Sequence, residues 1–547
     1  MHLRDDNKKK LLESTFDVLV IGGGINGAVS AAALAGQGVY SAVIDKGDFA
    51  GVTSQHSSNL IWGGIKYMES YEFPLVRKLC LSRNRLMMSF PSSVREIRFY
   101  ANIDRKSKYG RFFIYLGTWL YFFLGSCFTK PPRLLSKKKI QKELPVINTA
   151  NSTGGVEYSD CYLVENDARF VFSFIRKALD SGAVAVNYIE ALSSSKAKNG
   201  VWETKARDRT DGSMFTIKSR SVINATGPFV DSYNLKSNQK TDHKHVFSKG
   251  IHIIVDSITS SGKIITFFAD DNRLFFVIPM GERSCIGTTD TRIESMPPEV
   301  TDEDRKYILE NINKRLNLNT PLSKSDIISE RCGVRPLVID RSKGVSADSD
   351  WTVLSRKHII ETDREQKYIS IFGGKLTDCL NIGNEIVREM EKMGFCRKGK
   401  INKWYGEPSA ELYEKFSEEM KSVKTKRENS VKPDSVLIER LWRCYGSHAF
   451  EILEYLKKSP ESSENIVSGT DFSEAELQYL AKYEMIVRLE DFTRRRSKIA
   501  LTLGNKFLFQ NAGLKKASEI LFGDLAEERY NELLSSIKET GGEGVKR

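Results

Sequence analysis

The chain has 547 residues, of which 40% are hydrophobic and 28% are charged, close to the average of globular proteins. This composition excludes a wholly disordered chain, a collagen-like fibre and a polytopic membrane protein, and the length predicts three to four domains. Lys and Arg number 83 and Asp and Glu number 70, so the net charge of +13 favours anionic partners: phosphorylated metabolites, anionic lipid or nucleic acid.

The first predicted unit is a strand, a glycine turn and a helix. The apolar run at 16–21 is typical of a buried parallel strand, and it leads through Gly22-Gly23-Gly24-Ile25-Asn26-Gly27 into a helix of small residues. A second strand at 40–44 ends at Asp45. Together these elements predict one complete βαβ unit.

The glycines of this unit form the pattern G-x-G-x-x-G, and Asp45 follows Gly24 by 21 positions. In this context the pattern predicts a dinucleotide site. Gly22 permits the tight turn, Gly24 lets the backbone approach a pyrophosphate at the helix N-terminus, and Gly27 allows close packing of helix and strand. Asp45 would accept hydrogen bonds from the adenosine ribose.

Residues 112–124, FFIYLGTWLYFFL, are almost all apolar but are too few to span a bilayer. Two interpretations stay open: a buried helix, or a helix lying in the plane of a membrane surface. The aromatic content and the basic residues that follow suit an anionic lipid surface. These basic residues are Lys130, Arg133, Lys137, Lys138 and Lys139.

Two more strand-like runs end in glycine, at 222–227 (VINATG) and at 368–374 (YISIFGG). Strand-rich stretches, notably 249–255 and 274–289, lie between them. The expected fold class is therefore α/β, with a Rossmann-type cofactor domain interleaved with a β-rich substrate domain. The expected boundaries are 15–70, 155–230 and 340–395 for the cofactor domain, and 71–154 and 231–339 for the substrate domain.

The chain changes character after about residue 396. Residues 418–435 are polar and charged, which suits a linker or exposed helix ends, and helical regions are expected at 436–457 and 474–503. Ser473 and Glu476 fit a capping box before the second region. We expect a helical C-terminal domain over 400–538.

The cysteines, the N-terminal sequence and the distribution of charge limit the cellular location and the kinds of partner that we expect. Eight cysteines form no C-x-x-C pair and none has a histidine at zinc-ligand spacing, so we expect reduced thiols, no metal site and a cytoplasmic or membrane-facing location. The N-terminal sequence MHLRDDNKKKLLE has no apolar stretch, so we expect no secretory signal peptide. The positive charge is spread along the chain without a recognition motif, so we expect no nucleic-acid partner.

At this density of motifs the chain resembles the FAD-dependent glycerol-3-phosphate dehydrogenase family, among the D-amino-acid-oxidase-like flavoproteins. The matching segments run in the same order from residue 16 to about residue 500. They are DVLVIGGGINGA (17–28), GGIKYMESYEFPLV (63–76), EYSDC (157–161), NDAR (166–169), INATGP (223–228), KGIH (249–252), FVIPM (276–280), IGTTD (286–290), GVRPL (333–337), SRKH (355–358), GGKLT (373–377), RCYGS (443–447) and EDFTRRRSK (490–498).

The resemblance implies FAD as the cofactor and oxidation of sn-glycerol 3-phosphate to dihydroxyacetone phosphate. Hydride would pass to the flavin, and electrons would leave to quinone or, in oxidase members of the family, to oxygen. The implied location is cytoplasmic and peripheral, on the inner face of the cytoplasmic membrane. A homodimer is left open.

The resemblance also implies the site residues. Arg335 and Arg356 match arginines that the family uses at the substrate, where a guanidinium holds phosphate by paired hydrogen bonds. His252 is the candidate base, and Lys375 would stabilise negative charge on the reduced flavin. The other expected substrate contacts are Lys66, Tyr67, Thr288 and Thr289. The expected cofactor contacts are Gly22, Gly23, Gly24, Asn26, Gly27, Asp45, Ser54, Ser58, Ala225, Thr226, Gly227, Gly373, Gly374, Lys375, Leu376 and Thr377.

The chain departs from the family pattern S-S-K-L-I-H-G-G-L-R-Y at 57–67. Asn59 replaces a lysine, Trp62 a histidine and Lys66 an arginine, and Asp378-Cys379-Leu380 replaces T-Y-R. Because the glycine frame is intact, FAD binding is expected to persist. Two alternatives stay open: a flavoprotein that oxidises another small anionic alcohol or amine, and a flavin-binding protein with a decayed catalytic face.

Overall fold

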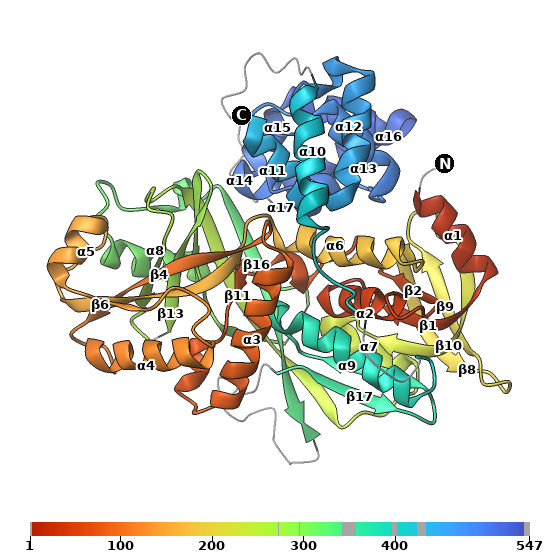
Figure 1. The fold of residues 1–547 in the computed structure, drawn as a ribbon, viewed down its shortest axis with the longest axis horizontal. Helices are drawn as coiled ribbons and strands as arrows, with labels where there is room; N and C mark the ends of the chain where they lie inside the picture. The colour runs from red at the N-terminus through yellow and green to blue at the C-terminus, as the bar shows by residue number, and fades with distance from the viewer. Residues whose placement is uncertain are drawn as a thin grey trace.

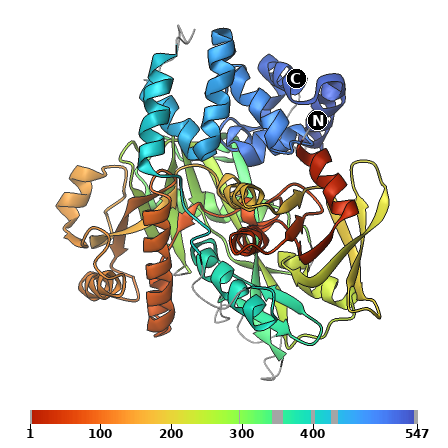
Figure 2. The ribbon, with the colours of Figure 1, turned by 45° about the vertical axis from the view of Figure 1, so that its right-hand side comes forward.

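A computed structural model describes residues 3–271, 273–294, 296–341, 357–396, 402–423 and 434–540. Two β-sheets lie side by side, and the helices of the C-terminal part sit above their junction in Figure 1 and in the turned view of Figure 2. This arrangement confirms the expected fold class: a Rossmann-type part, an interleaved β-rich part and a helical C-terminal domain.

The first sheet has the strand order β17-β18-β10-β1-β2-β7, with β8 and β9 continuing from β10. Its strands are β1 (Thr15–Ile21), β2 (Ser41–Ile44), β7 (Val184–Val186), β8 (Ile189–Lys196), β9 (Trp202–Asp208), β10 (Met214–Asn224), β17 (Ile359–Asp363) and β18 (Tyr368–Phe372). The pairs between β18, β10, β1, β2 and β7 are parallel. Both faces are covered, which explains the continuous apolar runs of these strands.

One face of this sheet packs on α2 (Ile25–Ala35), α6 (Asp167–Asp180) and α9 (Cys379–Lys392). The small side chains of α2 are almost all buried, so that α6 and α9 can approach it from both sides. The other face is covered by α1 (Leu3–Glu13), α7 (Val230–Lys236) and the β8–β9 pair. Strands from three distant parts of the chain thus complete one core.

The second sheet has ten strands, with a path β15-β11-β14-β13-β12-β4-β6-β3 that β16 and β5 join. Its strands are β3 (Leu60–Ile61), β4 (Val94–Asp104), β5 (Arg133–Leu135), β6 (Ser152–Leu163), β11 (His243–Asp256), β12 (Ile264–Phe268), β13 (Leu274–Met280), β14 (Arg283–Gly287), β15 (Thr291–Ile293) and β16 (Ser329–Asp340). Its helices are α3 (Phe73–Ser89), α4 (Arg111–Leu124), α5 (Lys137–Glu143) and α8 (Asp302–Arg315). The expected domain boundary at residue 155 therefore falls inside β6, a strand that pairs along its length with β4.

The aromatic segment forms α4, in which Thr118 and Tyr121 are the buried residues. Large apolar side chains of this helix point into solvent: Phe112, Phe113, Leu116, Leu120 and Phe123, with exposed fractions from 42% to 63%. The interpretation as a buried core helix is therefore wrong. Within the described ranges, no helix has the length and hydropathy needed to cross a bilayer.

The C-terminal domain consists of α10 (Ala410–Ser422), α11 (Asp434–Tyr445), α12 (Ala449–Lys458), α13 (Glu474–Tyr483), α14 (Ile499–Thr502), α15 (Gly504–Gln510), α16 (Ala512–Phe522) and α17 (Ala526–Thr540). The helical region expected at 436–457 is broken at Gly446, and the one expected at 474–503 contains a π-helical turn, Asp491–Arg496. Ser473 accepts from the backbone of Glu476, but the Glu476 carboxylate binds Arg440 instead of closing a capping box. Most of the expected linker, residues 424–433, lies outside the described residues.

Candidate functional site

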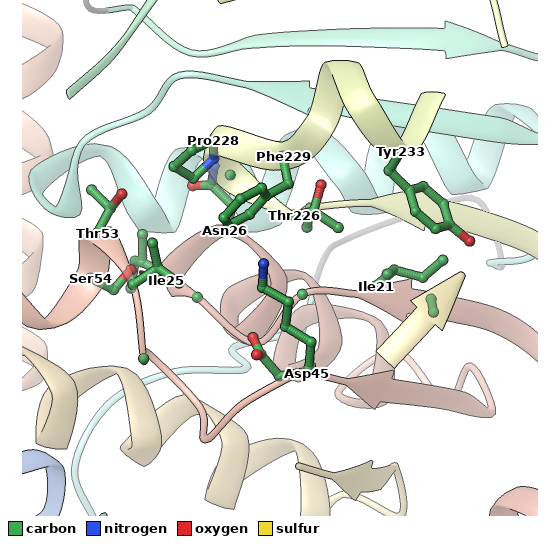
Figure 3. A pocket seen from close by; sticks show the side chains of 18 of the residues that line it. Ile21, Ile25, Asn26, Asp45, Thr53, Ser54, Thr226, Pro228, Phe229 and Tyr233 are labelled. Atoms are coloured by element: carbon green, nitrogen blue, oxygen red, sulfur yellow. Dashed lines mark hydrogen bonds between the residues drawn. The ribbon is translucent and has the colours of Figure 1, made fainter. Parts of the chain in front are cut away.

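A cavity of about 180 Å³ opens at the carboxyl ends of β1, β2 and β10. In an open parallel sheet this edge is where ligands bind. Figure 3 shows Ser54, Asp45 and Thr226 around the cavity, with Tyr233 at its far side. The residues predicted for the cofactor that line it are Gly22, Gly24, Asn26, Asp45, Ser54, Ala225, Thr226, Gly227, Gly373 and Gly374.

The glycine turn is built for a close approach of backbone to ligand. Gly22 has a φ of +102°, and a Cβ there would lie 2.5 Å from the Ala225 carbonyl oxygen. A Cβ on Gly27 would lie 1.8 Å from the Gly22 carbonyl oxygen, so helix and turn touch as expected. Gly24 would meet only the Ser54 hydroxyl, at 3.3 Å, so its backbone faces the cavity.

Polar groups at this turn fit a dinucleotide. Ser54 Oγ accepts from the Ile25 amide at 3.0 Å, at the first turn of α2. The buried atoms Asn26 Oδ1 and Thr53 Oγ1 have no hydrogen-bond partner among the described residues. A helix N-terminus with open polar atoms and no Cβ in the way suits a pyrophosphate, so these residues fit FAD.

Asp45 lines the cavity, and its carboxylate accepts from the Gly23 amide at 2.7 Å and from the Gly47 amide at 2.9 Å. Burial raises the pKa of Asp45 to about 6, against the lowering effect of these two bonds. The carboxylate therefore fixes the glycine turn at the edge of the cavity.

Two of the predicted site residues, His252 and Arg335, lie on β11 and β16, which are antiparallel neighbours. The register pairs Ser248 with Arg335 and His252 with Arg331. Because directly opposed residues share a face and alternate residues return to it, Arg335 and His252 lie on the same side of the sheet. Pro336, next to Arg335, lines the cavity.

Arg335 is held by a set of oxygen acceptors. Its Nη1 donates to Asp290 Oδ1 at 2.9 Å and to the carbonyl oxygens of Lys249 and Thr289, and its Nη2 donates to Thr288 Oγ1 at 2.8 Å. Any side chain at Gly250 would collide with the guanidinium, since a Cβ would lie 1.9 Å from Nη2. The guanidinium is thus fixed in direction at the sheet surface.

His252 is 4% exposed, and its Nδ1 has no hydrogen-bond partner among the described residues. Burial, together with the charges of Arg335 and Arg331, lowers the pKa of His252 to about 3. The imidazole is therefore neutral at physiological pH. Phe276, on the same face, packs edge-on against Trp62 with ring centroids 6.4 Å apart.

Lys375 joins the two halves of the site. It follows Gly374, which lines the cavity, and its ammonium donates to the Tyr67 hydroxyl and lies 3.7 Å from the centre of the Tyr67 ring. Thr377 donates to the Trp62 carbonyl at 3.2 Å. The turn after β18 therefore connects the cavity with the segment that departs from the family pattern.

Other predicted residues lie elsewhere. Lys66 is exposed, and Thr289 is buried with its hydroxyl accepting from the Ile251 amide. The predicted cofactor residues that do not line the cavity are Gly23, Gly27, Ser58, Lys375, Leu376 and Thr377. Arg356 lies outside the described residues.

The sequence reasoning missed some of the cavity lining. Thr53, Phe229, Tyr233, Lys46 and Pro336 contribute to it. Thr53 and Pro336 are direct neighbours of predicted residues and could have been found by extending the motifs. Phe229 and Tyr233 follow the INATGP motif on a short helical stretch whose sequence carries no ligand signal.

Comparisons with known proteins agree over most of the chain. Residues 17–358 match the family described as FAD dependent oxidoreductase, and residues 403–509 match the C-terminal domain of alpha-glycerophosphate oxidase. The chain is 31% identical to a glycerol-3-phosphate dehydrogenase of Pseudomonas aeruginosa, covering 90% of this chain and 93% of the relative. It is 29% identical to a D-erythritol 1-phosphate dehydrogenase of Brucella abortus, covering 89% and 95%. The fold is similar to the crystal structure of a glycerol-3-phosphate dehydrogenase from Bacillus halodurans complexed with FAD, with a TM-score of 0.74, 24% identity and 98% of each chain covered.

Proposed function

The chain belongs to the FAD dependent oxidoreductase family, and from this premise we propose that it oxidises the secondary alcohol of sn-glycerol 3-phosphate to dihydroxyacetone phosphate. The C-terminal match and the activity of the Pseudomonas relative support this substrate. When bound, FAD supplies the acceptor for the hydride. The protein's own residues have three tasks: they bind the phosphate, take the hydroxyl proton and exclude water.

The observation that carries the proposal is the pairing of a fixed cation with a neutral base on one sheet face. The register of β11 and β16 puts Arg335 and His252 on the same face of the sheet. A phosphate ester would bind the Arg335 guanidinium, sharing it with Asp290 and Thr288, by charge-assisted hydrogen bonds. The hydroxyl proton would go to His252, whose Nδ1 has no hydrogen-bond partner among the described residues. A phosphate dianion bound to Arg335 would offset part of the positive charge that lowers the pKa of this imidazole.

Lys375 adds a second cation at the border of cavity and substrate face. Its contact with Tyr67 holds the ammonium near the surface that the substrate would cover. A fixed positive charge here would stabilise negative charge that develops during oxidation, because donors fixed in advance need no reorganisation. Trp62 and Phe276 supply apolar surface that keeps water away from this charge.

The test is an anaerobic titration of the purified protein with sn-glycerol 3-phosphate, followed by visible flavin absorption. Bleaching of the oxidised flavin spectrum at substoichiometric to stoichiometric substrate is the expected result. Glycerol without phosphate is the matched control and should leave the spectrum unchanged. A flavin that stays oxidised with every substrate offered would instead support a binding protein with a decayed catalytic face.

A second candidate is oxidation of a longer polyol phosphate. It is favoured by the similarity to the D-erythritol 1-phosphate dehydrogenase. Trp62, which stands where the family carries histidine and packs against Phe276, changes the groups offered to a substrate. Comparing flavin reduction rates for glycerol 3-phosphate and D-erythritol 1-phosphate separates the two. A faster rate with the four-carbon substrate would replace the first proposal by the second.

The exposed face of α4 supports a peripheral membrane location on the inner face of the cytoplasmic membrane. Phe112 and Phe113 are 62% and 63% exposed, and Lys130 and Lys138 on the following segment are exposed as well. Aromatic side chains beside cations suit an anionic lipid surface, where quinone would accept the electrons.

Two measurements test this location. The double variant Phe112→Ser and Phe113→Ser should lose most of its sedimentation with phosphatidylglycerol vesicles, while the control Leu235→Ser, 83% exposed on α7, should keep it. Equal sedimentation of the double variant and the control would show that α4 does not contact the membrane surface. We expect the protein to reduce a water-soluble quinone faster than it forms hydrogen peroxide in air. Faster formation of hydrogen peroxide would identify an oxidase.

A further inference from the structure

The C-terminal domain contributes no residue to the described lining of the cofactor cavity. It nevertheless touches the segment directly behind that lining. Residues 50–54, which follow β2, line the cavity and will be called the cradle loop. The Ala50 amide donates to the Gly23 carbonyl, and Ser54 caps the first turn of α2, so the cradle loop is part of the dinucleotide site.

The anchor of the cradle loop is Asp48, which is 2% exposed. Its Oδ2 accepts from Arg495 Nε at 2.9 Å and from Arg496 Nη1 at 2.8 Å. Its Oδ1 accepts from Arg496 Nη2 at 3.0 Å and from Asn187 Nδ2 at 2.9 Å. Both oxygens of one buried carboxylate are thus bound, chiefly by two consecutive arginines of the C-terminal domain.

The same π-helical turn makes further contacts with the loop. Arg495 Nη1 donates to Gln55 Oε1 at 3.3 Å, and Gln55 donates to the Gly51 carbonyl at 2.6 Å. Arg494 Nη2 lies 3.2 Å from His56 Nδ1. Arg496 therefore contacts the chain before the cradle loop, Arg494 contacts the chain after it, and Arg495 contacts both.

The arginines are themselves fixed from within the molecule. Arg496 donates to the Glu484 carbonyl, and its guanidinium lies 3.9 Å from the centre of the Phe172 ring. Arg495 also binds Asp491, whose carboxylate accepts from the Tyr188 hydroxyl at 2.8 Å. Because these contacts hold Arg495 and Arg496 in place independently of the cradle loop, the C-terminal domain sets the position of Asp48 together with the loop itself.

We propose that Arg495 and Arg496 are positioning residues for FAD: through Asp48 and Gln55 they hold the cradle loop in the conformation that binds the dinucleotide. The C-terminal domain then determines how tightly FAD is retained, although it does not reach the cofactor cavity itself. This inference concerns cofactor retention and does not depend on which alcohol is oxidised.

The experiment measures FAD release from the full-length holoprotein after dilution, by the recovery of free FAD fluorescence, together with visible circular dichroism of the bound flavin. Arg496→Gln should release FAD at least about tenfold faster and change the flavin dichroism, because it removes two of the bonds to Asp48. Arg496→Lys, which keeps the charge but loses the paired bonds, should lie between Arg496→Gln and the unchanged protein.

The matched control is Arg440→Gln. Arg440 is a buried arginine of the same domain that binds Glu476 by two hydrogen bonds of 2.7 and 2.6 Å and does not contact the cradle loop. It should lower the melting temperature but leave the FAD release rate within about twofold of the unchanged protein.

If Arg496→Gln does not fold, Gln55→Ala tests the same connection without disturbing an ion pair, and should release FAD about threefold faster or more. The proposal would be overturned if Arg496→Gln and Arg440→Gln changed the FAD release rate and the flavin dichroism to the same extent for the same fall in melting temperature. An unchanged release rate in Gln55→Ala, where only that variant folds, would overturn it too.

Discussion

The cofactor cradle, which comprises the glycine turn at 22–27 and the cradle loop, and the substrate face, which carries Arg335 and His252, bind anions in opposite ways. In the cradle, backbone amides and the N-terminus of α2 face the cavity because glycines leave room for them. On the substrate face, side-chain cations such as Arg335 project from a sheet and are aimed by the oxygens around them. The cradle thus depends on the absence of side chains, whereas the substrate face depends on particular side chains. The departures at 59, 62 and 66 lie outside the glycine motif and leave it intact.

Breaking the cradle should have the largest effect. In Gly27→Ala the new methyl group would lie 1.8 Å from the Gly22 carbonyl oxygen, so α2 and the turn have to separate. We expect the protein to purify without flavin, and isothermal titration to detect no FAD binding in the micromolar range. Gly38→Ala, where a Cβ meets nothing within 4 Å but φ is +78°, serves as a control for backbone strain alone.

Removing the base tests the substrate face next. His252→Asn should retain FAD but reduce kcat by about 10² to 10⁴-fold, the usual contribution of a general base. Because the pKa of His252 is about 3, kcat/KM of the unchanged protein should show no acid limb from this group between about pH 4.5 and 8, once the phosphate ionisation of the substrate is accounted for. A limb near pH 6.5 that vanishes in His252→Asn would contradict this environment.

Changing the phosphate contact should have a smaller effect. Arg335→Lys keeps a positive charge but loses the planar fork, so we expect kcat/KM to fall by about 10²-fold, mainly through KM. Arg335→Ala should raise KM further, by the loss of several kcal/mol. FAD affinity should be unaffected in both. An unchanged KM in Arg335→Ala would exclude the phosphate role.

The smallest expected effect concerns the direction of the guanidinium. Thr288→Val removes the hydroxyl that accepts from Arg335 Nη2 at 2.8 Å and keeps the side-chain volume. The loss of one such bond corresponds to about 1 kcal/mol, so KM should rise about fivefold with little change in kcat. If kcat instead fell by a larger factor than KM rose, Thr288 would act at the reacting carbon.

The two regions also differ in how well a sequence reveals them. The cradle follows from local pattern, because G-x-G-x-x-G and Asp45 lie within one βαβ unit. The face shared by Arg335 and His252 depends on strand register across 83 residues of chain, which no local pattern specifies. Phe229 and Tyr233 could not be predicted because short helices after a strand carry no ligand signal. The burial of α4 could not be predicted because it depends on what packs against the helix.

The contact between Asp48 and the C-terminal arginines has a consequence for biosynthesis. Asp48 leaves the ribosome 447 residues before Arg495, and β1 must wait for its neighbour β10 as well. At elongation rates of about 5 to 20 residues per second, roughly 20 to 90 s separate the two events, and until then Asp48 lacks the two arginines that bind both of its oxygens. A chain that ends before residue 495 therefore lacks the arginines that hold the cradle loop, and by the proposal above it should retain FAD less tightly than the full-length protein.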